Sequence, residues 1–158
     1  VLDGGFSAWQ AAGLATEATQ VALPESEFAV QTSLCKTVTA EELLQPSLPM
    51  LDARDEKRFR GEQEPIDPIA GHIPGALCLP FINNLTLQGH FKSRDELRAQ
   101  IADLGFSTDQ AIICYCGSGV TACHNILALR HAGFPEPYLY PGSWSEWITD
   151  PDRPIATV

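Results

Sequence analysis

The clearest hydrophobic pattern in the chain is an apolar run over residues 111–116 that stops at a glycine-rich turn. A short apolar run bounded by turn residues is typical of a buried β-strand. After the turn at residues 117–119, apolar residues recur at helical spacing from Ala122 to Leu129. The segment therefore predicts a strand, a tight loop and a helix, with Cys116 at the end of the strand.

Other hydrophobic segments alternate along the chain in the same way. Ser93 with Glu96 has the spacing of a helix capping box, as do Thr39 and Glu42. The sequence predicts helices over residues 39–44, 54–59, 93–104 and 120–132, and strands over residues 49–54, 76–80, 111–116 and 138–140. This alternation predicts an α/β fold, with a central parallel sheet, helices on both faces and ligands at the carboxyl ends of the strands.

Composition and charge exclude several classes of partner. The chain has 158 residues, 44% of them hydrophobic, enough for one core and an appendage. A net charge of −10 argues against nucleic acid and anionic membranes, and no apolar stretch approaches the roughly 18 residues of a membrane span. The five cysteines lack the spacing of a disulfide framework. We therefore expect reduced cysteines and a cytoplasmic location.

The start of the chain resembles its end. Residues 1–14 and 139–148 both predict a short strand, a glycine turn and a helical turn that carries aromatic residues. We interpret residues 1–22 as the closing segment of an earlier copy of the domain, in a chain cut from a longer protein. Residues 23–34 are expected to be a linker, and residues 35–158 the complete domain.

The loop after Cys116 predicts nucleophilic chemistry. The backbone N–H groups of such a turn and the dipole of the following helix favour a negative charge, and hence a thiolate. Gly117 and Gly119 can adopt positive φ, which would point successive N–H groups at the sulfur. Thr121 is expected to shape the end of the loop through a hydrogen bond from its hydroxyl to the backbone.

A zinc site is the competing interpretation of this cysteine cluster. Cys114, Cys116, Cys123 and His124 are all possible zinc ligands. Their spacing does not match the paired knuckles of structural zinc sites, because Cys114 lies in a strand and Cys123 in a helix. We therefore predict no metal and no other cofactor.

Five motifs in order resemble the C-terminal domain of two-domain rhodaneses, and the cysteine loop most resembles the 3-mercaptopyruvate sulfurtransferases. The motifs are Asp52-Ala-Arg54, Arg58-Phe-Arg-Gly61, Gly71-His-Ile-Pro-Gly-Ala76, Cys116-Gly-Ser-Gly-Val-Thr121 and Tyr140-Pro-Gly-Ser-Trp-Ser-Glu-Trp147. Residues 1–14 resemble the end of the N-terminal rhodanese domain of this family.

The resemblance implies sulfur-atom transfer. Cys116 would take a sulfur from 3-mercaptopyruvate or thiosulfate as a persulfide and pass it to cyanide, a small thiol or thioredoxin. The loop residues Gly117, Ser118, Gly119, Val120 and Thr121 would hold the anionic sulfur. Ser118 would relay a proton with a histidine and an aspartate of the N-terminal domain, which this chain lacks.

The resemblance gives a role to Arg58, and the local sequence gives roles to other residues outside the loop. Arg58 would bind the anionic end of the donor, whereas Arg54 is expected to pair with Asp52 or a neighbour near the strand end. His72 is expected to fix a turn, and His124 lies too far along its helix to act as a base. Trp144 and Trp147 are expected to fill the core.

One position departs from the family pattern. Mercaptopyruvate enzymes commonly have a second arginine where this chain has Ile66. This difference leaves thiosulfate open as a donor.

Two other function classes share parts of this pattern. A cysteine-loop phosphatase or arsenate reductase needs an arginine at the position occupied by Ala122. A rhodanese-like binding module without activity would typically have lost the cysteine, which is present here as Cys116.

Overall fold

The computed structural model describes residues 1–19, 22–31, 33 and 35–158. The strands are β1 (Lys36–Thr37), β2 (Met50–Asp52), β3 (Ala76–Cys78), β4 (Ile113–Tyr115) and β5 (Tyr138–Leu139). The α-helices are α1 (Gly5–Ala11), α2 (Glu56–Arg60), α3 (Arg94–Asp103), α4 (Val120–Ala132) and α5 (Ser143–Trp147), and two 3-10 helices are η1 (Glu42–Leu44) and η2 (Phe81–Asn84).

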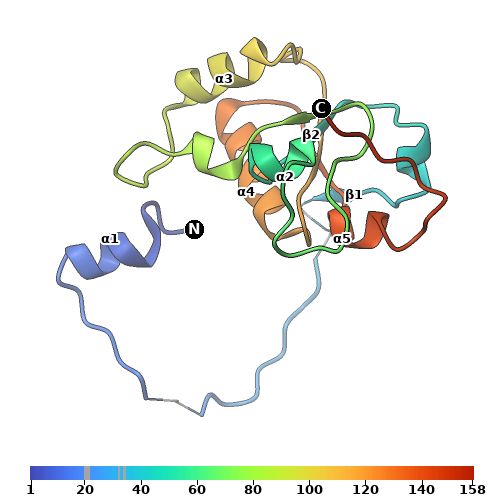
Figure 1. Cartoon of the computed structure of the whole chain (residues 1–158). Helices are drawn as coiled ribbons and strands as arrows, with labels where there is room; N and C mark the ends of the chain where they lie inside the picture. The colour runs from blue at the N-terminus through green and yellow to red at the C-terminus, as the bar shows by residue number, and fades with distance from the viewer. Residues whose placement is uncertain (20–21, 32, 34) are drawn as a thin grey trace.

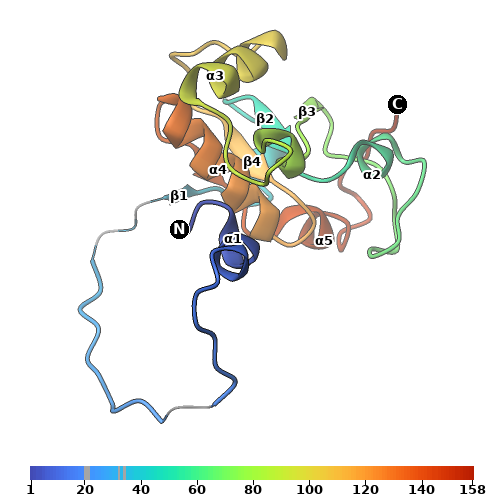
Figure 2. The same ribbon diagram turned by 90° about the vertical axis from the view of Figure 1, so that its left-hand side faces the viewer.

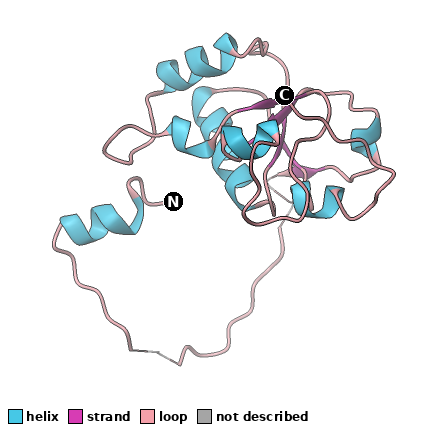
Figure 3. Cartoon of the chain, in the orientation of Figure 1, coloured by secondary structure: helices cyan, strands magenta, loops and turns pink. Residues whose placement is uncertain are grey.

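The strands form one parallel sheet in the order β1-β5-β4-β2-β3. Figure 1 shows the course of the chain, and Figure 3 shows its strands in magenta among the helices. In its register, Asp52 at the end of β2 lies opposite Tyr115 on β4 and Cys78 on β3. Parallel strands end at the same edge of a sheet, so the residues that follow β2 and β4 meet there. The predicted parallel α/β fold is confirmed.

The two faces of the sheet are buried in separate cores because side chains alternate along β4. Cys114 and Cys116 pack with residues of α3 and α4. Ile113 and Tyr115 pack with residues of η1, α2 and α5. Figure 2 shows α3 and α4 on one side of the strands and α2 and α5 on the other. The expected helices on both faces are therefore present.

Local signals fixed the longer helices as predicted. The Ser93 hydroxyl accepts a hydrogen bond from the Glu96 N–H, and Glu96 accepts one from the Ser93 N–H, which completes the capping box of α3. Gly133 ends α4 in the left-handed conformation. Residues 39–44 make the equivalent contacts between Thr39 and Glu42, but only a 3-10 helix forms there.

β1 was not predicted, and the N-terminal segment contains less regular structure than the sequence predicted. β1 has two exposed residues, and its place in the sheet comes from pairing with β5. The helical turn expected near the N-terminus is α1, but the strand expected before it does not form among the described residues. Residues 22–31 are exposed and have neither helix nor strand. Positions 20 and 21 of the expected closing segment, and 32 and 34 of the expected linker, lie outside the described residues.

Within the described part of the chain, no helix has the length and hydrophobicity that crossing a bilayer requires.

Candidate active site

Cys116 directly follows β4 and is 2% exposed. Its N–H donates to Ser143 Oγ at 3.1 Å, and its carbonyl accepts from the Trp144 N–H at 2.9 Å. The next carbonyl, that of Gly117, accepts from the Ser145 N–H at 2.9 Å. Three consecutive residues at the start of α5 therefore hold the first turn of the cysteine loop in place.

Ser143 is one of the positions at the candidate site that the sequence did not reveal. It is fully buried and has a φ of 54°, which is rare for a residue other than glycine. This backbone turn lets its hydroxyl donate to the Tyr140 carbonyl at 2.9 Å while accepting from Cys116. The sequence analysis took the closing motif as core packing. Trp144 and Trp147 are indeed fully buried, but the backbone of the motif also supports the loop.

The two loop glycines have different roles. Gly119 has a φ of 82°, and a side-chain Cβ there would lie 2.6 Å from the Pro141 carbonyl oxygen, so only glycine fits. Gly117 does not adopt positive φ, which corrects the expectation for that residue. A Cβ on Gly117 would lie 3.5 Å from Arg58 Nη2, so the cysteine loop approaches the guanidinium of Arg58 at this glycine.

The loop leaves backbone donors for a ligand. Among the described residues, the N–H groups of Gly117, Ser118 and Gly119 have no acceptor. Val120 begins α4, whose first N–H groups lack partners within the helix. The helix dipole adds positive potential at the same place. The expected hydrogen bond from the Thr121 hydroxyl to the backbone is absent among the described residues, and Thr121 instead lines the pocket.

A pocket of about 200 Å³ opens over this loop. It is lined by Arg58, Ile66, Asp67, Cys116, Gly117, Ser118, Val120, Thr121 and Ser145. Apart from Gly119, which is buried beneath Pro141, the pocket brings together every residue that the sequence analysis placed in the site. It also adds Asp67 and Ser145, which the sequence analysis did not single out.

Arg58 is held in the pocket wall by two carboxylates. Its Nε donates to both oxygens of Glu64, at 2.8 and 2.9 Å, and its Nη2 donates to Asp67 Oδ2 at 2.9 Å. The Ser145 hydroxyl donates to the other oxygen of Asp67 at 2.7 Å. Nη1 of Arg58 has no acceptor among the described residues.

Glu64 stays ionised in this network. Burial raises the pKa of its carboxyl group, but hydrogen bonds from Arg58 and from the N–H groups of Asp67 and Ile66 outweigh burial and lower the pKa below its ordinary value. The same carboxylate also accepts from Arg54 Nη1 at 3.3 Å. Glu64 therefore links the arginine at the pocket to the arginine in the core.

The predicted pair of Arg54 and Asp52 is confirmed. Arg54 Nη2 lies 2.7 Å from Asp52 Oδ2, and both side chains are almost fully buried. Nη2 also donates to the Gly71 carbonyl at 2.6 Å, and the guanidinium stacks on the Trp144 ring at 4.7 Å. Arg54 thus joins the end of β2 to the loop before β3.

Neither histidine considered in the sequence lines the cysteine pocket. His72 is buried, stacks on Phe59 at 3.8 Å and hydrogen-bonds through Nδ1 to the Phe59 carbonyl. This placement agrees with its predicted structural role. His124 stacks on Phe91, and burial lowers the pKa of its ring.

The cysteine cluster does not form a metal centre among the described residues. Cys114 is fully buried in the core, where burial raises the pKa of its thiol. Cys123 is exposed on α4 and donates to the Gly119 carbonyl. In the described ranges, no group of three or more histidine, cysteine, aspartate or glutamate side chains could hold a metal ion.

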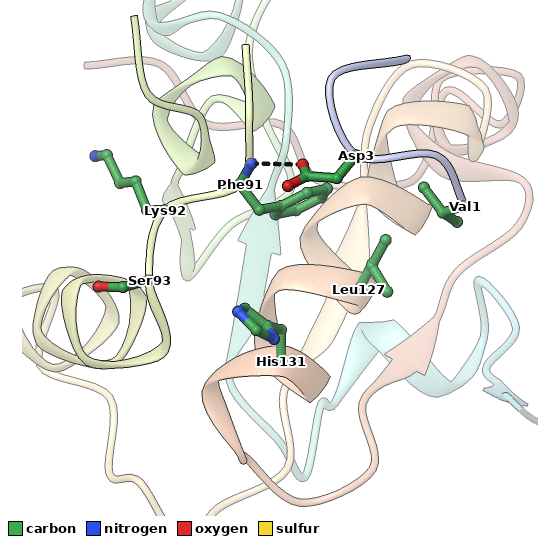
Figure 4. Close-up of a pocket in the computed structure, with 7 residues that line it drawn as sticks. All are labelled: Val1, Asp3, Phe91, Lys92, Ser93, Leu127 and His131. Atoms are coloured by element: carbon green, nitrogen blue, oxygen red, sulfur yellow. Dashed lines mark hydrogen bonds between the residues drawn. The ribbon is translucent and has the colours of Figure 1, made fainter. Parts of the chain in front are cut away.

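A second pocket, of about 340 Å³, lies at the other end of α4 (Figure 4). It forms where the N-terminal segment meets the domain: Asp3 Oδ1 accepts from the Phe91 N–H at 2.9 Å, the dashed line in Figure 4. Val1 and Leu127 give it an apolar wall. It shares no lining residue with the pocket at Cys116.

The fold and the cysteine loop define the class of this protein. Residues 38–150 match the rhodanese-like domain family, and the chain belongs to that family.

Several proteins similar to this chain are named as sulfurtransferases. A Pseudomonas aeruginosa protein named "Probable 3-mercaptopyruvate sulfurtransferase" is 52% identical over 99% of this chain and 57% of its own length. The 3-mercaptopyruvate sulfurtransferase of Escherichia coli K12 is 39% identical over the whole chain and 58% of its own length. The structure of 3-mercaptopyruvate sulfurtransferase from Leishmania major superposes with a TM-score of 0.75 at 35% identity, covering 93% of this chain and 42% of that one. The chain therefore spans about half the length of the relatives it matches.

Proposed function

We propose that this protein is a sulfurtransferase that carries sulfur as a persulfide on Cys116. The observation that carries the proposal is the position of Cys116 in a small pocket whose loop has unpaired N–H groups and whose wall contains the guanidinium of Arg58. A thiolate needs such a positive setting, and a persulfide needs the same setting for its terminal sulfur. The relatives named as sulfurtransferases support the proposal.

In the proposed first step, the Cys116 thiolate attacks the outer sulfur of thiosulfate. A bond forms between Sγ and that sulfur, the bond between the two donor sulfurs breaks, and sulfite leaves with the electron pair. With 3-mercaptopyruvate, the carbon–sulfur bond breaks instead, and the pyruvate enolate that leaves takes up a proton. In the second step, an acceptor attacks the outer persulfide sulfur, and the thiolate of Cys116 is restored.

Each pocket residue has a place in this scheme. The N–H groups from Gly117 to Thr121 would hold the outer sulfur, and Nη1 of Arg58 would bind the carboxylate or sulfonate of the donor. Ser118 is exposed at the mouth of the loop, where its hydroxyl could pass a proton to the leaving enolate. Its relay partners would come from the N-terminal domain.

We also propose that residues 1–22 close an N-terminal rhodanese domain, that residues 23–34 link the two domains, and that residues 35–158 form the catalytic domain. The limited share of each relative that the chain covers supports this division. The proposed acceptors are a small thiol, cyanide or thioredoxin, and the proposed compartment is the reducing cytoplasm.

Phosphoryl transfer is less compatible with the site. Ala122, at the position where a cysteine-loop phosphatase needs its arginine, is buried and apolar. A binding module without activity would not need a cysteine loop held by three hydrogen bonds beside an arginine.

The test is the mass of the intact protein after incubation with thiosulfate or 3-mercaptopyruvate. We expect a gain of one sulfur atom, which Cys116→Ser abolishes. Cys123→Ser is the matched control, because it changes the exposed thiol on α4 and should leave the adduct in place. If the full-length protein gains no sulfur from either donor, the proposal is wrong.

A further inference from the structure

Asp67 places a negative charge in the wall of the cysteine pocket. Its side chain is 8% exposed and is fixed at both oxygens, by Arg58 at 2.9 Å and by the Ser145 hydroxyl at 2.7 Å. Its Oδ2 lies 3.9 Å from the point where a Cβ on Gly117 would stand. The carboxylate is therefore held directly beside the cysteine loop, on the side where a donor must bind.

The charged side chains around Arg58 do not sum to a positive charge that would attract an anion. Arg58 belongs to a connected network of two arginines and three carboxylates, because Glu64 also contacts Arg54 and Arg54 pairs with Asp52. Among the described residues that line the pocket, Arg58 is the only cation, and its neighbour Ile66 is apolar. The ionised side chains of this network thus add up to a net negative charge, which the loop N–H groups and the helix dipole offset.

The two candidate donors respond differently to such a wall. Near neutral pH, 3-mercaptopyruvate carries one negative charge on its carboxylate, and thiosulfate carries two. Repulsion by a fixed carboxylate grows with the charge of the donor, and it is strong in a small, partly buried pocket. Asp67 also occupies Arg58 Nη2, which a second donor oxygen would otherwise use.

We propose that Asp67 is a specificity-determining residue that disfavours doubly charged sulfur donors relative to singly charged ones. This inference rests on the proposed sulfurtransferase function and identifies the donor class that the pocket selects.

The test compares two donors that differ mainly in charge. Methanethiosulfonate has the same sulfonyl–sulfur bond as thiosulfate, but a methyl group replaces one charged oxygen. For each donor, the second-order rate constant of Cys116 persulfide formation is measured by rapid quenching and intact mass, in the full-length protein. We expect Asp67→Asn to raise the ratio of the thiosulfate to the methanethiosulfonate rate constant by about tenfold.

A second variant keeps the test valid if Asp67→Asn does not fold. Ile66→Arg adds a positive charge beside Asp67 at a position that is 75% exposed, and it removes none of the hydrogen bonds of Asp67. We expect it to raise the same ratio. Glu62→Gln removes a charge from an exposed position in the same loop, and Ile69→Arg adds one at a position that does not line the pocket. Both controls should leave the ratio unchanged.

The outcomes separate the two proposals. If the wild type forms the persulfide and a folded Asp67→Asn does not raise the ratio, the inference about Asp67 is wrong and the proposed function stands. If Asp67→Asn does not fold, an unchanged ratio in Ile66→Arg has the same meaning. If the controls raise the ratio as much as the pocket variants, net charge rather than Asp67 sets the preference, and the inference is again wrong. If the wild type forms no persulfide with any donor, both proposals fail.

Discussion

Arg54 and Arg58 are the same residue type, four positions apart, and both contact Glu64, yet they lie in different surroundings. The side chain of Arg54 is 1% exposed and donates to Asp52, to Glu64 and to the Gly71 carbonyl, with an aromatic ring against its face. Arg58 is 10% exposed, and its Nη1 has no acceptor among the described residues. The unused donor, rather than the salt bridges, distinguishes the arginine that can bind a ligand.

The two arginines also differ in what their removal would do to the neighbouring carboxylates. Without Arg54, Asp52 would be fully buried with no opposite charge. Without Arg58, Glu64 would keep Arg54, and Asp67 would keep the Ser145 hydroxyl. Loss of Arg54 should therefore damage the fold, whereas loss of Arg58 should mainly damage the site.

The largest expected effect is on stability. We expect Arg54→Met to lower the free energy of unfolding by about 3–5 kcal/mol, because breaking a buried ion pair leaves an uncompensated charge. Urea denaturation followed by fluorescence of the buried tryptophans measures this effect. A loss no greater than that of Arg58→Met would show that the two arginines do not differ in the way proposed.

The next effect is on activity. We expect Arg58→Met to lower kcat/KM for persulfide formation by about 10- to 100-fold, because a charge-assisted hydrogen bond to the donor is lost. Its free energy of unfolding should fall by only about 1–3 kcal/mol. Arg58→Lys keeps the charge but loses the planar fork, so it should recover only part of the activity. Full activity in Arg58→Met would show that Arg58 does not bind the donor.

The smallest effect concerns acid stability and the shared carboxylate. Because the pKa of Glu64 is lower in the folded state than in the unfolded chain, its contribution to stability is complete above the unfolded pKa of about 4.3. That contribution is lost as the pH falls through the folded pKa. Glu64→Gln should therefore lose less stability than the wild type on acidification below about pH 4.3, as measured by urea unfolding at each pH. Glu62→Gln, at an exposed position in the same loop, is the charge-matched control. If the free energies of unfolding of Glu64→Gln and the wild type fall in parallel as the pH is lowered, Glu64 does not link the networks of Arg54 and Arg58.

The sequence predicted those parts of the molecule whose signals are local. The apolar run of β4, the glycines around Cys116 and the capping box of α3 each act over a few residues, so their pattern was sufficient. Ser143 and Asp67 could not be found in this way, because their roles depend on contacts that no local pattern encodes. Ser143 contacts Cys116, which lies 27 positions away in the chain, and Asp67 contacts Ser145, which lies 78 positions away. β1 was missed for the same reason, since two exposed residues form a strand only beside β5. Arg58 was identified from the resemblance to rhodaneses, but the two carboxylates that hold it were not.

The three hydrogen bonds between residues 143–145 and the cysteine loop determine when the backbone of that loop becomes ordered. Ordering a backbone costs about 1–2 kcal/mol per residue in conformational entropy. Here the loop is ordered when the domain folds, since α5 and β4 belong to one core and hold it between them. In the proposed reaction, a sulfur atom that arrives at Cys116 would therefore meet donors that are already oriented. Its binding would require no further ordering of this loop, and its release would leave the loop unchanged for the next turnover.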